Sequence, residues 1–171
     1  MTHDQRSVLT TTCLSHATIH VFELSIPALL WLIQSDFGAD DLQMGTVAAF
    51  YALLFGVGAL PAGFLVDRLG SKALLVMCLW GGSVSLLGMA ASSTIVSFAV
   101  AAGFMGLALS IYHPAGTALI THAIPLSGRV FAYHGMAGNL GVAGSSVIAG
   151  TLGALLGWRW ALALLASAGP Q

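Results

Sequence analysis

The sequence has 171 residues, of which 57% are hydrophobic and only 6% are charged, and its net charge is −1. About a quarter of the residues of a soluble domain are charged, so this composition excludes a soluble domain and predicts a protein of the lipid bilayer. The sequence has no basic run and no basic residues interleaved with aromatic ones, so we expect no nucleic-acid partner.

Long apolar runs follow one another along the chain. A helix that crosses about 30 Å of hydrocarbon needs roughly 20 residues, and five runs meet this length: residues 9–33, 43–66, 73–91, 95–121 and 130–155. A sixth run begins near Trp158, but at about 1.5 Å per residue it reaches only about 21 Å by Gln171, too short to cross. We therefore predict an all-α polytopic membrane helix bundle with five complete transmembrane helices and a truncated sixth, forming a single domain over residues 1–171.

The first run carries an unusual set of polar residues. His16, His20 and Glu23 are spaced i, i+4 and i+7, which at about 100° per residue places them within one narrow arc of a helix. Because a carboxyl group in mid-membrane is costly, we expect this arc to face the protein interior. Pro27 lacks the amide hydrogen that would bond the carbonyl of Glu23, so that oxygen is free on the same face. The arc is a candidate binding face; the alternative is that these residues only hold helices together.

The same spacing raises a metal-binding alternative, because His16, His20 and Glu23 could supply three ligands to a metal ion. A zinc hydrolase would carry Glu directly after the first His, where Ala17 stands. The further histidine pairs that other membrane metalloenzymes need are absent from the sequence. We therefore expect no metal and no cofactor, and a protein that is not an enzyme.

A short charged island, GFLVDRLGSK, separates the second and third runs. Its two glycines allow a tight reversal of the backbone, which predicts a hairpin loop between two membrane helices. The pattern G-x-x-x-D-R-x-G-x-K resembles the loop between helices 2 and 3 of the major facilitator superfamily, although Ser71 stands where that family often has a second basic residue. The resemblance implies that part of a cytoplasmic gate is formed by Gly63, Asp67, Arg68, Gly70 and Lys72.

Basic residues predict the orientation of the bundle. If the N-terminus is inside, four of the five Lys and Arg residues are cytoplasmic and only Arg159 is outside. Cytoplasmic loops carry an excess of Lys and Arg. We therefore predict a multi-pass protein of the cell membrane with a cytoplasmic N-terminus.

The fourth run contains SIYHPAGTALI, in which Tyr112 and His113 precede Pro114. Pro114 frees the carbonyl of Ser110 and predicts a kink, and a kinked helix with an unpaired carbonyl usually lines a cavity. Helices 1 and 4 would be the first members of two inverted three-helix repeats, and both place His and Pro deep in the membrane. We expect the two helices to share one site; the alternative is a kink that serves packing alone.

Small residues recur at every fourth position of the fifth run, which predicts a flat stripe where another helix backbone can approach closely: Ala137, Gly141, Ser145, Ala149 and Gly153. His134 and Asn139 lie near the start of this run, where such residues more often serve packing than a site. Asn139 is nevertheless a candidate for the transport pathway.

Four stretches resemble the fosmidomycin-resistance-type branch of the same superfamily: CLSHATIHVFELSIPALLWLIQSDFG, SIYHPAGTALI, GNLGVAGSS and GWRWAL. The resemblance implies that this chain is the N-terminal half of a twelve-helix secondary transporter, with its site at the membrane midplane. The implied partners are the lipid bilayer, a small-molecule substrate, protons and the missing C-terminal six-helix half. One departure is that helix 4 lacks the Arg that many proton-coupled exporters have there.

We therefore predict proton-coupled efflux of a small polar or drug-like molecule. Glu23 would carry the proton, and the pathway for proton and substrate would also include His16, His20, Tyr112, His113 and Asn139. Two alternatives remain. One is a truncated membrane fragment or packing partner that does not transport, and the other, less favoured, is a membrane metal-binding protein that uses His16, His20 and Glu23.

Overall fold

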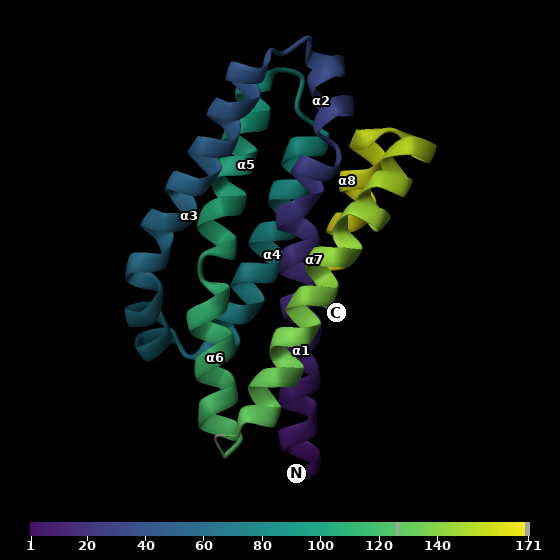
Figure 1. The fold of residues 1–171 in the computed structure, drawn as a ribbon. Coiled ribbons are helices and arrows are strands. Elements are labelled where there is room, and N and C mark those ends of the chain that lie inside the picture. The colour runs from purple at the N-terminus through teal and green to yellow at the C-terminus, as the bar shows by residue number, and fades with distance from the viewer. Residues whose placement is uncertain (126, 170–171) are drawn as a thin grey trace.

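The computed structural model describes residues 1–125 and 127–169, and over these residues it contains eight helices and no strand (Figure 1). The helices are α1 (His3–Ala28), α2 (Leu30–Phe37), α3 (Asp41–Leu69), α4 (Ser71–Ala90), α5 (Ile95–Leu109), α6 (Tyr112–Ala123), α7 (Gly128–Leu156) and α8 (Trp158–Ala166). A helix satisfies its backbone hydrogen bonds internally, as the interior of a bilayer requires. The prediction of an all-α membrane bundle is confirmed.

The membrane-length helices match the predicted runs. Helices α3, α4 and α7 are each long and apolar enough to cross a membrane, as is the run Ile95–Ala123, which contains α5 and α6. Helices α1 and α2 together make a fifth apolar stretch, bent by 49° at their junction. Helix α8 begins at Trp158, where the sixth run was expected.

Both breaks within these spans lie near a proline, and the one before Pro114 was predicted from the sequence. The break between α1 and α2 falls at Leu29, two residues after Pro27. The break between α5 and α6 falls at Ser110 and Ile111, shortly before Pro114. A proline removes one helical hydrogen bond and its ring crowds the preceding turn, which explains the break before Pro114. The break at Leu29 follows Pro27, so this crowding does not explain it.

The charged island differs from its prediction. Helix α3 continues to Leu69 and α4 starts at Ser71, so Gly70 alone joins them, with a φ of +83°. Gly63, Asp67 and Arg68 therefore lie on the last turns of α3, and the expected loop from Gly63 onward is wrong. One residue at positive φ is enough to end one helix and start the next, so the polar residues beside it stay helical.

The small-residue stripe of α7 packs along α1. A methyl group added at Gly141 would overlap the backbone of Ala17, and one added at Gly153 would overlap Leu29. Ser145 and Ala149 on the same stripe are buried. The predicted close approach of two backbones is confirmed, and it fixes the position of α1 along the axis of α7.

The two ends of the bundle differ in charge. The start of α1, the junction of α3 with α4 and the start of α7 lie at the lower end in Figure 1. Four of the five Lys and Arg residues belong to these segments: Arg6, Arg68, Lys72 and Arg129. The fifth, Arg159, starts α8 at the opposite end.

Arg159 joins three segments at its end of the bundle. One guanidinium nitrogen, Nη2, donates to Oδ2 of Asp36 in α2 at 2.8 Å. The other, Nη1, donates to the carbonyls of Ala90 at 3.1 Å and Ser92 at 2.6 Å, between α4 and α5. The ion pair is 40% and 46% exposed and adds little, so we expect the two carbonyl bonds to contribute more than the ion pair does.

We expect Arg159→Ala to lower the free energy of unfolding by about 1–3 kcal/mol, since it leaves two carbonyls without their charged donor. The measurement is thermal unfolding of purified protein in detergent. Arg129→Ala is the matched control, because Arg129 is exposed and has no ion pair or side-chain hydrogen bond within the described residues. Equal melting temperatures for the two variants would contradict the role of Arg159.

Candidate functional site

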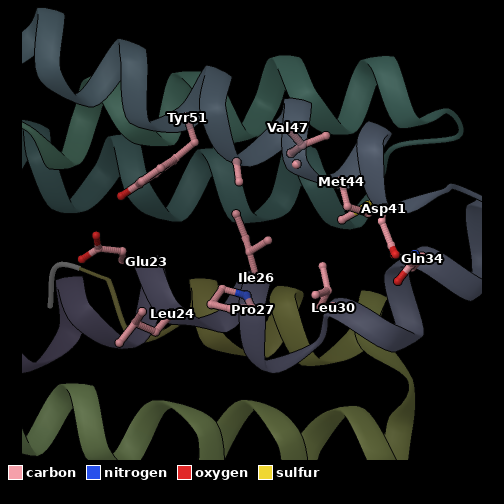
Figure 2. Close-up of a pocket in the computed structure, with 12 residues that line it drawn as sticks. Glu23, Leu24, Ile26, Pro27, Leu30, Gln34, Asp41, Met44, Val47 and Tyr51 are labelled. Atoms are coloured by element: carbon pink, nitrogen blue, oxygen red, sulfur yellow. Dashed lines mark hydrogen bonds between the residues drawn. The ribbon is translucent and has the colours of Figure 1, made fainter.

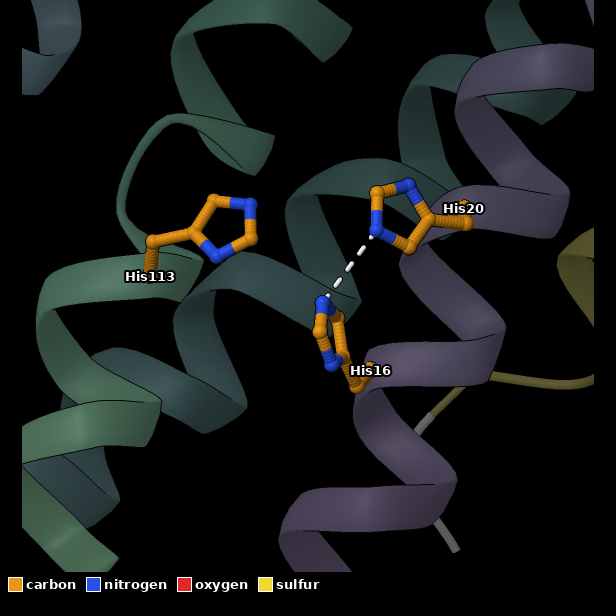
Figure 3. A group of neighbouring side chains, drawn as sticks. All are labelled: His16, His20 and His113. Atoms are coloured by element: carbon orange, nitrogen blue, oxygen red, sulfur yellow. Dashed lines mark hydrogen bonds between the residues drawn. The ribbon is translucent and has the colours of Figure 1, made fainter. Parts of the chain in front are cut away.

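Four histidines from three helices meet near the middle of the bundle. His16 of α1 has its ring centroid 4.9 Å from that of His20, 5.4 Å from that of His113 on α6 and 4.2 Å from that of His134 on α7. We call these four residues the histidine cluster; Figure 3 shows three of them converging from α1 and α6. The structure thus brings α1 and α6 together at these histidines, and the two helices are the ones that the paired His and Pro residues pointed to.

A line of hydrogen bonds runs along α1 through this cluster. Oε2 of Glu23 lies 3.2 Å from Nδ1 of His20, and Nε2 of His20 lies 3.2 Å from Nε2 of His16. Nδ1 of His16 lies 2.9 Å from the carbonyl oxygen of His134. The predicted arc of three side chains is therefore a connected line that ends on the backbone of α7.

The line of hydrogen bonds restricts which nitrogen and oxygen atoms can carry a hydrogen. A carbonyl only accepts, so Nδ1 of His16 donates, and Nε2 of a neutral His16 accepts from Nε2 of His20. Nδ1 of His20 and the carboxyl of Glu23 then share a single proton, either as carboxylic acid and neutral ring or as carboxylate and imidazolium. Removing that proton leaves two acceptors facing each other at one contact. With this proton present, every contact along the line pairs one donor with one acceptor.

Tyr112 anchors the cluster. Its buried hydroxyl donates to the carbonyl of Thr12 at 2.6 Å, so Nε2 of His134 must donate to the hydroxyl oxygen, 3.1 Å away. Gly138, one turn after His134, leaves the space that the His16 ring occupies, since a methyl group there would come 2.5 Å from that ring. Tyr112 thus positions His134 between α1 and α6.

A cavity of about 500 Å³ opens beside this line, between α1 with α2 and α3. In Figure 2, Glu23 and the hydroxyl of Tyr51 lie at one end, and Gln34 and Asp41 at the other. Gln34 donates to Oδ1 of Asp41 at 2.7 Å. Apart from these groups the lining is almost entirely apolar, and both charged side chains in it are acidic: Glu23 and Asp41.

Tyr51 is the unsatisfied group of this cavity. Its hydroxyl is buried, faces the carboxyl group of Glu23 and makes no hydrogen bond of standard geometry within residues 1–125 and 127–169. A buried polar group without a partner is unfavourable by about 1–3 kcal/mol. The Glu23 end of the cavity is therefore ready to accept a polar group of a ligand.

Other candidates lie away from the cluster. Asn139 is exposed on α7 and makes no side-chain hydrogen bond in the part of the chain that the structure describes. The predicted gate residues lie toward the opposite end of α3 from Asp41, where Arg68 stacks on Phe64 with its guanidinium 4.1 Å from the ring centroid. Asn139 and the gate motif are not brought to the histidine cluster.

Comparison with known proteins gives a family. A sequence profile described as the Major Facilitator Superfamily matches residues 12–169. A puromycin resistance protein of Streptomyces alboniger is 30% identical over 146 residues, which cover 83% of this chain and 28% of that protein.

Two relatives carry names that refer to sugar acids. A probable L-galactonate transporter of Escherichia coli is 27% identical over 131 residues, which cover 74% of this chain and 28% of that protein. A D-galactonate transporter of the same species is 24% identical over 130 residues, which cover 75% and 30%. The chain thus spans less than a third of the length of these relatives.

Proposed function

Because the chain belongs to the Major Facilitator Superfamily, we propose that it forms part of a secondary active transporter that exports a small polar or drug-like molecule in exchange for protons. Transport rather than catalysis follows from the family. Export is supported by the resemblance to the fosmidomycin-resistance-type branch and by the drug-resistance name of one relative. The proposal includes a second six-helix half that completes the pathway.

The observation that carries the proposal is the position of Glu23. It is the one acidic residue of the sequence that lies away from the ends of the described helices. Its carboxyl group forms part of the cavity wall and also ends the line through His20 and His16. A group in both places can respond to substrate and to protons, which is what coupled exchange requires.

The chemistry of exchange follows from the groups that face Glu23. His20 contacts it from α1, Tyr51 faces it from α3, and the His113 ring lies 6.1 Å from that of His20 on the α6 side. A substrate donor bound beside Glu23 would stabilise the carboxylate, and a proton would neutralise it. Substrate and proton would therefore displace each other.

Charge distinguishes between the substrates named for the relatives. The described residues that line the cavity include Glu23 and Asp41 and no Lys or Arg. A sugar-acid anion would face two carboxylates there, whereas a neutral or cationic polar molecule would not be repelled. We therefore propose a drug-like substrate in preference to a sugar acid.

The experiment uses proteoliposomes that contain the intact gene product. Exchange predicts that an interior-acid gradient drives substrate into the vesicles, because protons leave as substrate enters. An exterior-acid gradient should not. Puromycin and L-galactonate are the two probes, and accumulation of L-galactonate under an exterior-acid gradient would contradict both the direction and the substrate class.

We also propose the cell membrane with a cytoplasmic N-terminus, based on the basic residues at one end of the bundle. In a variant without Cys13 and Cys78, a membrane-impermeant thiol reagent added to intact cells should label Ser93→Cys and not Ser71→Cys. Ser93 lies between α4 and α5, and Ser71 starts α4 at the basic end. Labelling of Ser71→Cys from outside would show that the orientation is the opposite of the proposed one.

A further inference from the structure

We propose that His16, His20 and His113 form a binding site for a divalent transition-metal ion of the zinc type. One ring nitrogen from each of the three lies within 4.8 Å of the other two. In a tetrahedral zinc site with metal–nitrogen distances of about 2.0–2.1 Å, ligand nitrogens are about 3.3 Å apart. The two Nε2 atoms of His16 and His20, at 3.2 Å, already have this spacing.

The opposite nitrogens of these two rings are held as they are in metal sites. A histidine that binds a metal usually donates its other ring N–H to a carboxylate or a backbone carbonyl, which fixes the ring. Nδ1 of His20 faces the carboxyl of Glu23, and Nδ1 of His16 faces the carbonyl of His134. Both rings are therefore held by their Nδ1 atoms, and the two Nε2 atoms are left to bind one ion.

This ligand set differs from the one that the sequence suggested. Glu23 lies behind His20, on its Nδ1 side, so it orients a ligand and is not the third ligand itself. The third ligand is His113, which lies on α6. Its side chain is exposed and its ring makes no hydrogen bond within the described part of the chain, so a small rotation toward the other two breaks no hydrogen bond.

The donor set selects the kind of ion. Three imidazole nitrogens suit zinc, nickel, copper and iron, whereas calcium and magnesium require oxygen ligands. Three protein ligands leave a fourth position open to water or to a ligand donor. The exposed side of His113 gives an ion access to the position. The assignment rests on where the nitrogen atoms lie and not on their protonation.

Occupancy would change the line of hydrogen bonds. An ion bound to Nε2 of both His16 and His20 replaces the hydrogen bond between them, so zinc should inhibit the proposed exchange. The binding itself does not depend on that exchange. Failure to bind zinc therefore leaves the transport proposal standing, and loss of proton coupling leaves the metal site standing.

The test measures Zn²⁺ binding by calorimetry on the intact gene product, purified with an affinity tag that contains no histidine. We expect Zn²⁺ to bind the parent, and His113→Ala to bind it at least tenfold more weakly. His122→Ala is the matched control, because His122 is exposed on the same helix and outside the cluster. It should bind like the parent.

Two further readouts separate a ligand from a structural residue. His113→Cys keeps a ligand atom and should restore most of the affinity that His113→Ala loses, and Glu23→Gln should weaken zinc binding by about 10–100-fold. Co²⁺ in the site should show the visible absorption of tetrahedral coordination in the parent and lose it in His113→Ala. A parent that binds no Zn²⁺, or a His113→Ala variant that binds it like the parent, would overturn the site.

Discussion

Glu23→Gln is expected to lower proton-driven exchange by about 100-fold or more, the range that a positioned proton-transfer group contributes. Glutamine keeps the size of the side chain and can still hydrogen-bond to His20, but it cannot take up or release a proton. Exchange of labelled for unlabelled substrate without a pH gradient should persist, because that reaction moves no net proton. The measurement compares the two modes in the same vesicles.

Asp41→Asn is the matched control for this prediction. Asp41 is the other carboxylate of the cavity, lies at its opposite end, and bonds to Gln34 instead of a histidine. Because Asp41 does not contact the histidines, Asp41→Asn should keep the dependence of exchange on the pH gradient, even where it changes the affinity for substrate. If Glu23 only held helices together, Glu23→Gln would be as active and as stable as the parent, and the proton-carrier role would be wrong.

Gly141→Ala is expected to cause the largest structural effect of any single methyl group discussed. The added carbon would overlap the backbone of Ala17, which cannot rotate out of the way as a side chain can. Overpacking of this kind lowers stability by about 1–3 kcal/mol, and here α1 must shift together with His16. The melting temperature and the rate of proton-driven exchange should therefore both be lower than in the parent.

Gly150→Ala on the same helix provides the comparison. A methyl group there has no neighbour within 4 Å among the described residues, so its effect should be neutral or slightly stabilising, since alanine is the better helix former. Equal melting temperatures for Gly141→Ala and Gly150→Ala would show that α1 and α7 do not approach each other at Gly141.

The sequence predicted the bundle well because lipid imposes simple rules. Helix length follows from bilayer thickness, and the break before Pro114 follows from proline chemistry. The stripe on α7 was found because small residues at helical spacing have one dominant use in membranes. The loop at Gly63 was wrong because charge in a sequence marks a membrane boundary and not the end of a helix.

The site was predicted along α1 and, through Tyr112 and His113 beside Pro114, on α6. His16, His20 and Glu23 share one helix, so their spacing fixes their common face. His134 and Tyr51 lie on other helices, and their rotation toward α1 depends on packing that no local pattern encodes. His134 carried a usable signal, since it precedes Gly138 by one turn on the small-residue face that meets α1. Asn139 follows Gly138 directly, and successive residues of a helix are rotated by about 100°, so Asn139 faces away from α1 and is exposed.

Proton release upon substrate binding tests the central claim most directly. Purified protein in weakly buffered detergent solution near neutral pH receives the substrate identified by the exchange experiment, and the released protons are measured. The parent should release protons in proportion to the substrate bound, because the substrate displaces the proton shared by Glu23 and His20. Glu23→Gln should bind substrate and release none. Equal release from the parent and from Glu23→Gln would contradict the assignment of Glu23 as the coupling group.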